Sequence, residues 1–117
     1  MYIRTNEGLG EPAGSSCVAA TKRLGLIKLY LDIGNLNWEK KNYHGAPIQK
    51  LKENVDGMIR DLDSYIRSGC CESQLAALKR EVRNLPWRSM NTQVVLMGRD
   101  LVKAIEGAQQ RSRTMCP

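Results

Sequence analysis

Four cysteines are the most reactive residues of this chain, and their spacing limits the chemistry open to them. Cys70 and Cys71 are adjacent, Cys17 and Cys116 lie far from them, and no C-x-x-C pair occurs. The single histidine, His44, is too distant in sequence to complete a recognisable zinc pattern. Adjacent cysteines suit the disulfide framework of a secreted protein, but the N-terminus lacks the apolar run of a signal peptide. We therefore expect free thiols, with a bridged set as the alternative.

Other residue types with catalytic potential do not form a recognisable site. The glycine-rich segment 8–16 superficially resembles a phosphate-binding loop, yet it lacks the Gly-Lys-Ser/Thr ending. The acidic residues of segment 53–63 lie among lysines and arginines, which is typical of a solvated helix face. No serine or cysteine nucleophile has an evident base. We expect a protein that is not an enzyme and that needs no cofactor and no metal.

The composition predicts one small basic domain. The 117 residues are 42% hydrophobic and 26% charged, which is typical of a globular chain, and phenylalanine is absent. The net charge of +6 favours acidic partners, namely nucleic acid, an anionic membrane surface or an acidic protein. No segment has the roughly 18 consecutive apolar residues of a transmembrane helix. The expected location is cytoplasmic or nuclear, with secretion possible only for a processed fragment.

Apolar residues recur every three or four positions, and this spacing predicts helices. The clearest stripe runs from Ile48 to Ile66 and leaves a polar opposite face. Similar stripes in the other segments predict an all-α fold, a small four-helix bundle that is mostly antiparallel. The expected parts are a flexible N-terminal arm at 1–15, helices at about 17–36, 47–68, 72–85 and 89–111, and a disordered tail at 112–117.

The helix at 17–36 has apolar residues on two sides, so one side must meet something beyond its nearest neighbour. Two further valines, Val95 and Val102, lie off the main stripe of the last helix. These residues predict an interface for a homodimer or for a partner helix, unless both strips are covered within the chain. The candidate interface residues are Leu26, Leu29, Ile33, Val95 and Val102.

Basic residues are most concentrated on the helix at 72–85, where three of them share about a third of the circumference. Such a face could contact a phosphate backbone with little sequence preference and strong salt dependence. No helix-turn-helix, zinc-finger or RNA-recognition signature is present. The candidate nucleic-acid-binding residues are Lys79, Arg80, Arg83 and Arg88, joined by Lys22, Arg23, Lys40 and Lys41 if the fold brings them near.

These observations favour a non-catalytic binding protein, a small viral or regulatory factor that binds RNA or another nucleic acid. The alternative is a protein-interaction module, such as a homodimeric adaptor or regulator. A secreted four-helix signalling protein with all four cysteines bridged is a third possibility.

Overall fold

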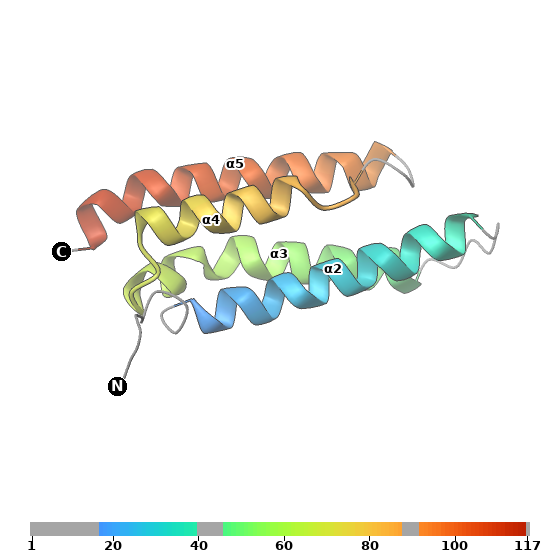
Figure 1. Ribbon diagram of the computed structural model, residues 1–117, viewed down its shortest axis with the longest axis horizontal. Coiled ribbons are helices and arrows are strands. Elements are labelled where there is room, and N and C mark those ends of the chain that lie inside the picture. The colour runs from blue at the N-terminus through green and yellow to red at the C-terminus, as the bar shows by residue number, and fades with distance from the viewer. Residues whose placement is uncertain (1–16, 40–45, 88–91, 117) are drawn as a thin grey trace, which may run out of the picture.

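The computed structural model describes residues 17–39, 46–87 and 92–116, and these form four helices. They are α2 (Val18–Glu39), α3 (Ala46–Arg67), α4 (Glu72–Arg83) and α5 (Thr92–Met115). Each helix runs opposite to the one before it, so the chain passes up and down the long axis (Figure 1). The prediction of an all-α four-helix bundle is confirmed. The predicted arm at 1–15 lies outside the described residues.

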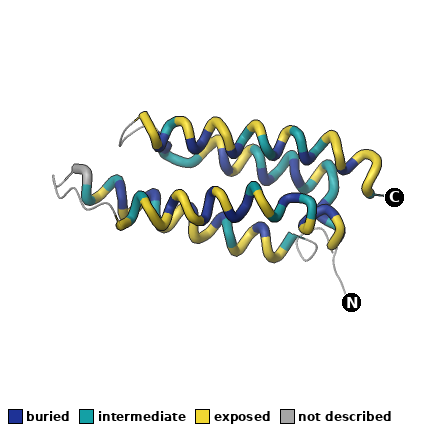
Figure 2. The backbone as a smooth tube through the Cα atoms, turned by 180° about the vertical axis from the view of Figure 1, so that it is seen from behind, coloured by how far each residue is buried: buried dark blue, intermediate teal, exposed yellow. Residues whose placement is uncertain are grey.

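The core lies between the helices, on the faces where the apolar stripes were predicted. α3 packs against both α2 and α5, and α5 packs against α4. Buried positions on every helix turn toward the middle of the bundle, and exposed positions turn outward (Figure 2). The stripe of α3 is fully buried from Leu51 to Ile66, and only its first residue, Ile48, is half-buried. Burial of this stripe is what fixes α3 at the centre of the packing.

Two helix ends differ from the predicted ones for local reasons. α2 continues to Glu39, three residues past the expected end, because no proline or capping glycine interrupts it there. α4 ends at Arg83, two residues early. The reason is Pro86, which disfavours helical geometry at the preceding residue, Leu85. Asn84 closes the helix, its backbone N–H lying 3.1 Å from the carbonyl oxygen of Arg80.

The prediction of a disordered tail after residue 111 is wrong, because α5 continues to Met115. Ser112 extends the buried stripe of this helix and is only 1% exposed. Its hydroxyl donates a hydrogen bond of 2.6 Å to the carbonyl oxygen of Gln109, so its burial leaves no polar atom unpaired. Because Ser112 is polar, the apolar periodicity did not predict this last helical turn.

The prediction of free thiols is also wrong, because the structure contains two disulfides. Cys17 is bonded to Cys70, and Cys71 is bonded to Cys116. Gly69 adopts a left-handed conformation with φ of 104°, which glycine allows without steric cost. The backbone N–H of Cys70 then bonds back to the carbonyl oxygen of Tyr65 at 2.9 Å, which ends α3 with a tight turn.

This turn lets the neighbouring residues Cys70 and Cys71 form disulfides with two cysteines that lie far apart in the sequence, Cys17 and Cys116. One bond ties the start of α2 to the α3–α4 connection, and the other ties that connection to the end of α5. Three chain segments are thereby joined at one end of the bundle (Figure 1). Sequence spacing could not show this, because bonding depends on distances that the fold alone creates.

Candidate interaction surfaces

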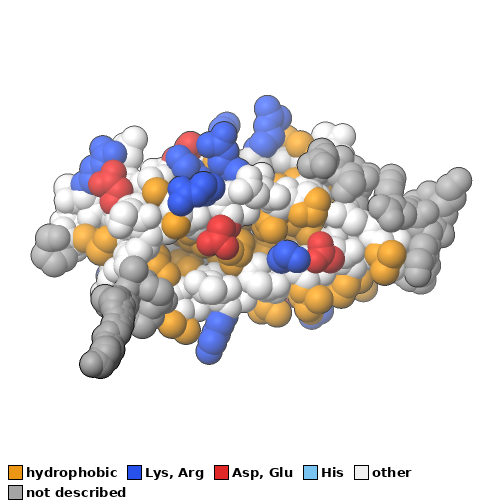
Figure 3. Space-filling model, viewed as in Figure 1, with side chains coloured by type: hydrophobic (Ala, Val, Ile, Leu, Met, Phe, Trp, Pro, Cys, Tyr) orange, Lys and Arg blue, Asp and Glu red, His pale blue; other side chains and the backbone are white. Residues whose placement is uncertain are grey.

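The outer face of α2 exposes a row of large apolar side chains. Leu26, Leu29, Ile33 and Leu36 follow one another at intervals of three, four and three residues. Val18 lies on the same side about two turns before Leu26, with the exposed Lys22 between them. All five are exposed, from 37% for Ile33 to 49% for Leu36. We call these five residues the α2 row. Figure 3 shows the hydrophobic side chains along the lower edge of the molecule, where α2 lies.

The opposite side of α2 is buried against α3. Ala20, Leu24, Ile27 and Leu31 are core residues, with Ile27 and Leu31 fully buried. The helix is therefore apolar on two opposite sides, as its sequence indicates, but only one side is covered within the part of the chain that the structure describes. Scattered apolar side chains are normal on a protein surface, whereas an unbroken run such as Leu26 to Leu36 marks a contact site.

Arg23 does not join a basic surface, because its side chain lies between α2 and α3. One guanidinium nitrogen is 3.4 Å from the side-chain oxygen of Asn54, and another is 3.5 Å from a carboxylate oxygen of Asp61. The guanidinium also covers Gly57, where an added Cβ would collide with it. Arg23 was predicted to contact phosphate, but in the structure its side chain joins α2 to α3.

The same polar contact adjoins Tyr65, which is buried and 5% exposed. Burial raises the pKa of its hydroxyl above the ordinary value of 10.0, although the positive charge of Arg23 acts in the opposite direction. The phenol therefore stays protonated in the folded protein over a wider pH range than in the unfolded chain.

The predicted basic face on α4 is only partly available. Lys79 lies 3.6 Å from a carboxylate oxygen of Glu106 on α5, so its charge is partly neutralised. Arg80 and Arg83 are exposed, and Lys22 is exposed at a distance on α2. Arg88, Lys40 and Lys41 lie outside the described residues. The fold thus leaves two of the three α4 cations free to meet an anion.

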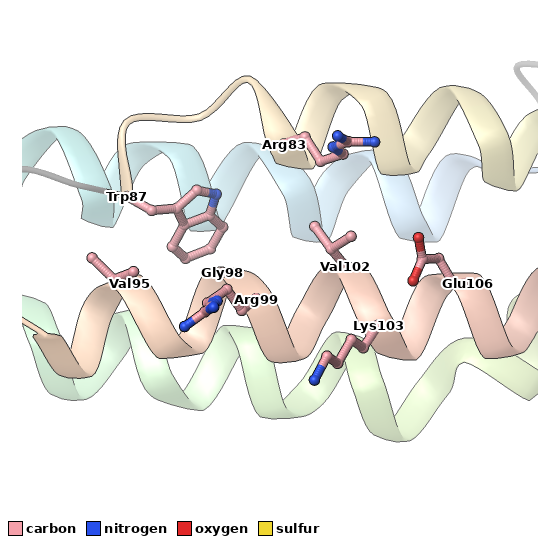
Figure 4. A pocket seen from close by; sticks show the side chains of 8 residues that line it. All are labelled: Arg83, Trp87, Val95, Gly98, Arg99, Val102, Lys103 and Glu106. Carbon is pink, nitrogen blue, oxygen red and sulfur yellow. The ribbon is translucent and has the colours of Figure 1, made fainter.

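A groove between α4 and α5 contains residues that the sequence pattern did not bring together. Its volume is about 450 Å³. Trp87, Val95, Gly98 and Val102 supply its apolar part, and Arg83, Arg99, Lys103 and Glu106 its charged part (Figure 4). Val95 and Val102, which we predicted as interface residues, are half-buried walls of this groove rather than part of the α2 row.

Five groove residues were not predicted as site residues from the sequence: Trp87, Gly98, Arg99, Lys103 and Glu106. Arg99 and Lys103 are spaced i, i+4, which places both on one side of α5 next to Val95 and Val102. That spacing was a usable signal, but nothing in the sequence shows that α4 brings Arg83 to the same place. Trp87 could not be predicted in this way, because it lies in a connection between helices, where there is no helical periodicity to interpret.

Other charges near the disulfide end form exposed pairs. Arg111 is 2.8 Å from Asp63, and Arg113 is 2.8 Å from Glu72, which raises the pKa of Arg113 by hydrogen bonding and charge. Exposed pairs of this kind stabilise a fold only slightly. They do, however, remove both arginines from the set of cations free to bind a partner.

Comparison with known proteins finds no matching family model, no matching curated protein and no matching solved structure. Within the described ranges, no helix is both long enough and apolar enough to cross a membrane. Across the same residues, no group of three or more histidine, cysteine and acidic side chains is arranged to hold a metal ion.

Proposed function

We propose that this chain is a non-catalytic binding protein of an oxidising compartment, and that it acts as a two-fold dimer through the α2 row. The observation behind the dimer is the row itself, whose side chains are exposed although they are as apolar as the core. The two disulfides support a location in an oxidising compartment, because thiols in the cytosol are kept reduced. This proposal favours the secreted alternative over the expected cytoplasmic or nuclear location.

The spacing of the row supports a helix of matching geometry as its partner. Intervals of three and four residues form the seam by which two helices pack side by side. A second copy of α2 offers this geometry without any further protein, since a two-fold contact needs one self-complementary patch.

The charges beside the row favour an antiparallel pairing of the two copies. Lys28 and Asp32 lie along one edge of the row, 3.1 Å apart at i, i+4. Reversing the second helix brings Lys28 of one copy toward Asp32 of the other. The same reversal moves Lys22 to the C-terminal end of the other α2, where the helix dipole is negative. A parallel pairing would instead place Lys22 against Lys22.

The size of the row predicts a weak dimer. Its exposed apolar surface is roughly 400 Å² per copy, about half of what each partner contributes to an interface of standard size. A dissociation constant in the micromolar range is therefore expected. The dimer would form at high local concentration, for example where many copies gather at a surface.

Sedimentation velocity over a wide concentration range tests the dimer. The double variant Leu29→Asp/Ile33→Asp should remain monomeric, because two carboxylates would be buried in the contact. Leu96→Asp on α5 is a matched control, since Leu96 is 46% exposed and lies outside the row. The control should dimerise like the unmodified protein. Unmodified protein that stays monomeric at the highest soluble concentration would refute the proposal.

Nucleic-acid binding, with RNA favoured, is a second candidate. Its support is the group of exposed cations Arg80, Arg83, Arg99 and Lys103 on α4 and α5. Figure 3 shows basic side chains gathered over these two helices, with few acidic ones between them. A dimer would present this surface twice to a duplex.

Binding of duplex RNA, single-stranded RNA and duplex DNA at several salt concentrations tests this candidate. Changing the four cations to glutamine should lower the slope of log affinity against log salt by roughly 3 units. The matched control changes Lys50, Lys52, Arg60 and Arg67 to glutamine, which removes the same charge from exposed positions on α3. Equal slopes for the two variants would exclude a site on α4 and α5.

A further inference from the structure

The floor of the groove between α4 and α5 is an indole ring packed on a helix. Trp87 lies over Gly98, and its indole nitrogen donates a hydrogen bond of 2.7 Å to the carbonyl oxygen of Val82 (Figure 4). A Cβ at position 98 would lie 2.6 Å from Cγ and Cδ2 of the indole, so only glycine allows the ring to rest directly on the helix. The ring is held by this hydrogen bond and by its contact with α5, and it is 8% exposed.

The walls next to this floor are apolar. Val95 and Val102 flank Gly98 along α5, three residues before it and four after it, and both are half-buried. The volume of about 450 Å³ falls within the range of small-molecule sites. The floor and walls can therefore take an apolar body without first rearranging.

The rim of the groove is positively charged. Arg83 reaches it from α4, and Arg99 and Lys103 reach it from α5. Among the described residues, none of these three side chains has an ion pair or a hydrogen bond. The one acidic side chain at the rim, Glu106, already faces Lys79 at 3.6 Å. An anion entering the groove would meet three cations and one carboxylate that is partly neutralised.

We propose that this groove binds an amphipathic anion, a compact apolar body ending in one carboxylate, sulfonate or phosphate. The apolar body lies against Trp87 and the two valines, and the anionic group is attracted by the positive charge at the rim, which Arg83, Arg99 and Lys103 supply. Guanidinium groups suit this role because they bind oxyanions through paired hydrogen bonds. This is a small-molecule site, separate from the α2 row and distinct in kind from the binding of a phosphate backbone.

Four probes separate the contributions of charge and of apolar surface. Octanesulfonate has both features, methanesulfonate has only the anionic group, octanol is uncharged, and octylammonium has the opposite charge. Titration into the ¹⁵N-labelled protein should give saturable shifts of the Gly98, Arg99 and Val102 amides with octanesulfonate. Each of the other three probes should bind at least about tenfold more weakly, since each lacks one kind of contact.

The double variant Arg99→Gln/Lys103→Gln should weaken octanesulfonate binding by at least about tenfold, because it removes two of the three rim cations. Lys50→Gln/Lys52→Gln on α3 is the matched control and should bind like the unmodified protein. All four side chains are exposed, so the fold is expected to persist, and far-UV circular dichroism checks this.

Three results would overturn the proposal. The first is equal binding of octanol or octylammonium, which would show an apolar patch without charge recognition. The second is equal binding of methanesulfonate, which would show a plain anion site of the kind that a nucleic-acid backbone uses. The third is a set of shifts that maps to the α2 row instead of the groove.

Discussion

Replacing Gly98 by alanine tests whether the indole of Trp87 really rests on the backbone of α5. In an open helix this change stabilises by about 1 kcal/mol, because alanine has the better helix propensity. Here the new Cβ would lie 2.6 Å from two atoms of the ring, so the ring must move. Overfilling a packed site costs about 1–3 kcal/mol. Moving the ring also lengthens its hydrogen bond to Val82, which contributes about 1 kcal/mol.

The sum of these effects is a loss of about 1–3 kcal/mol in the free energy of unfolding. A domain of this size loses about 4 °C or more in Tm for each kcal/mol. Thermal and urea unfolding, followed by far-UV circular dichroism with the disulfides intact, measures the change. Gly107→Ala on the same helix is the matched control. There the nearest atom to an added Cβ is the flexible guanidinium tip of Arg111 at 3.3 Å, so a gain of up to about 1 kcal/mol is expected.

A double-mutant cycle makes this prediction sharper. Trp87→Ala should cost about 3–5 kcal/mol, since it empties a buried aromatic site. In that background Gly98→Ala has no ring to displace and should stabilise by about 1 kcal/mol. If Gly98→Ala stabilises the unmodified protein as much as Gly107→Ala does, the contact between ring and helix is wrong. The same conclusion follows if the effect of Gly98→Ala is identical with and without Trp87.

Three further predictions concern the disulfides, Tyr65 and Arg23. Changing Cys71 and Cys116 to serine should lower the free energy of unfolding by about 4 kcal/mol, because the bond closes a loop with a sequence separation of 45. Chemical unfolding measures this loss, and a thiol assay on the denatured, unreduced protein should detect no free cysteine; four reactive thiols would contradict both disulfides. For Tyr65, burial raises the pKa in the folded state above the ordinary 10.0, so the unfolded chain releases its proton first. The contribution of Tyr65 to the free energy of unfolding should therefore be constant below about pH 10 and be lost above it. Tyr65→Phe should flatten the alkaline fall in stability, and an unchanged alkaline profile in this variant would contradict the sign. Arg23→Gln should cost about 1 kcal/mol in the free energy of unfolding without changing the salt dependence of RNA binding, whereas Lys22→Gln should leave stability unchanged. A loss of RNA affinity specific to Arg23→Gln would return this residue to the nucleic-acid surface.

Much of the fold could be predicted because helical periodicity is a local property. Leu51, Val55, Met58 and Leu62 recur at the spacing that one helix face requires, and all four are buried. The helix ends were less predictable, because they depend on single residues whose effect is decided by their tertiary contacts. Ser112 belongs to the buried stripe only because its hydroxyl can bond back to Gln109.

The candidate sites could be predicted in part. The row from Leu26 to Ile33 is visible as a second apolar side of one helix, and the structure leaves that side exposed. The basic residues were harder to place, because a long cationic side chain can turn toward solvent or toward a neighbouring helix. Arg23 turns inward to Asp61, and Lys79 turns across to Glu106, whereas Arg83 stays exposed.

The four cysteines show the difference between what the sequence determines and what only the tertiary structure decides. By itself the sequence determined that helices form, which faces are apolar and that the chain is basic, since these follow from residue type and spacing along one element. Only the tertiary structure decided that Cys17 meets Cys70, that Cys71 meets Cys116 and that Trp87 rests on Gly98. Each of these contacts joins residues from different elements. Their distances are set by how the helices pack together, which no local pattern records.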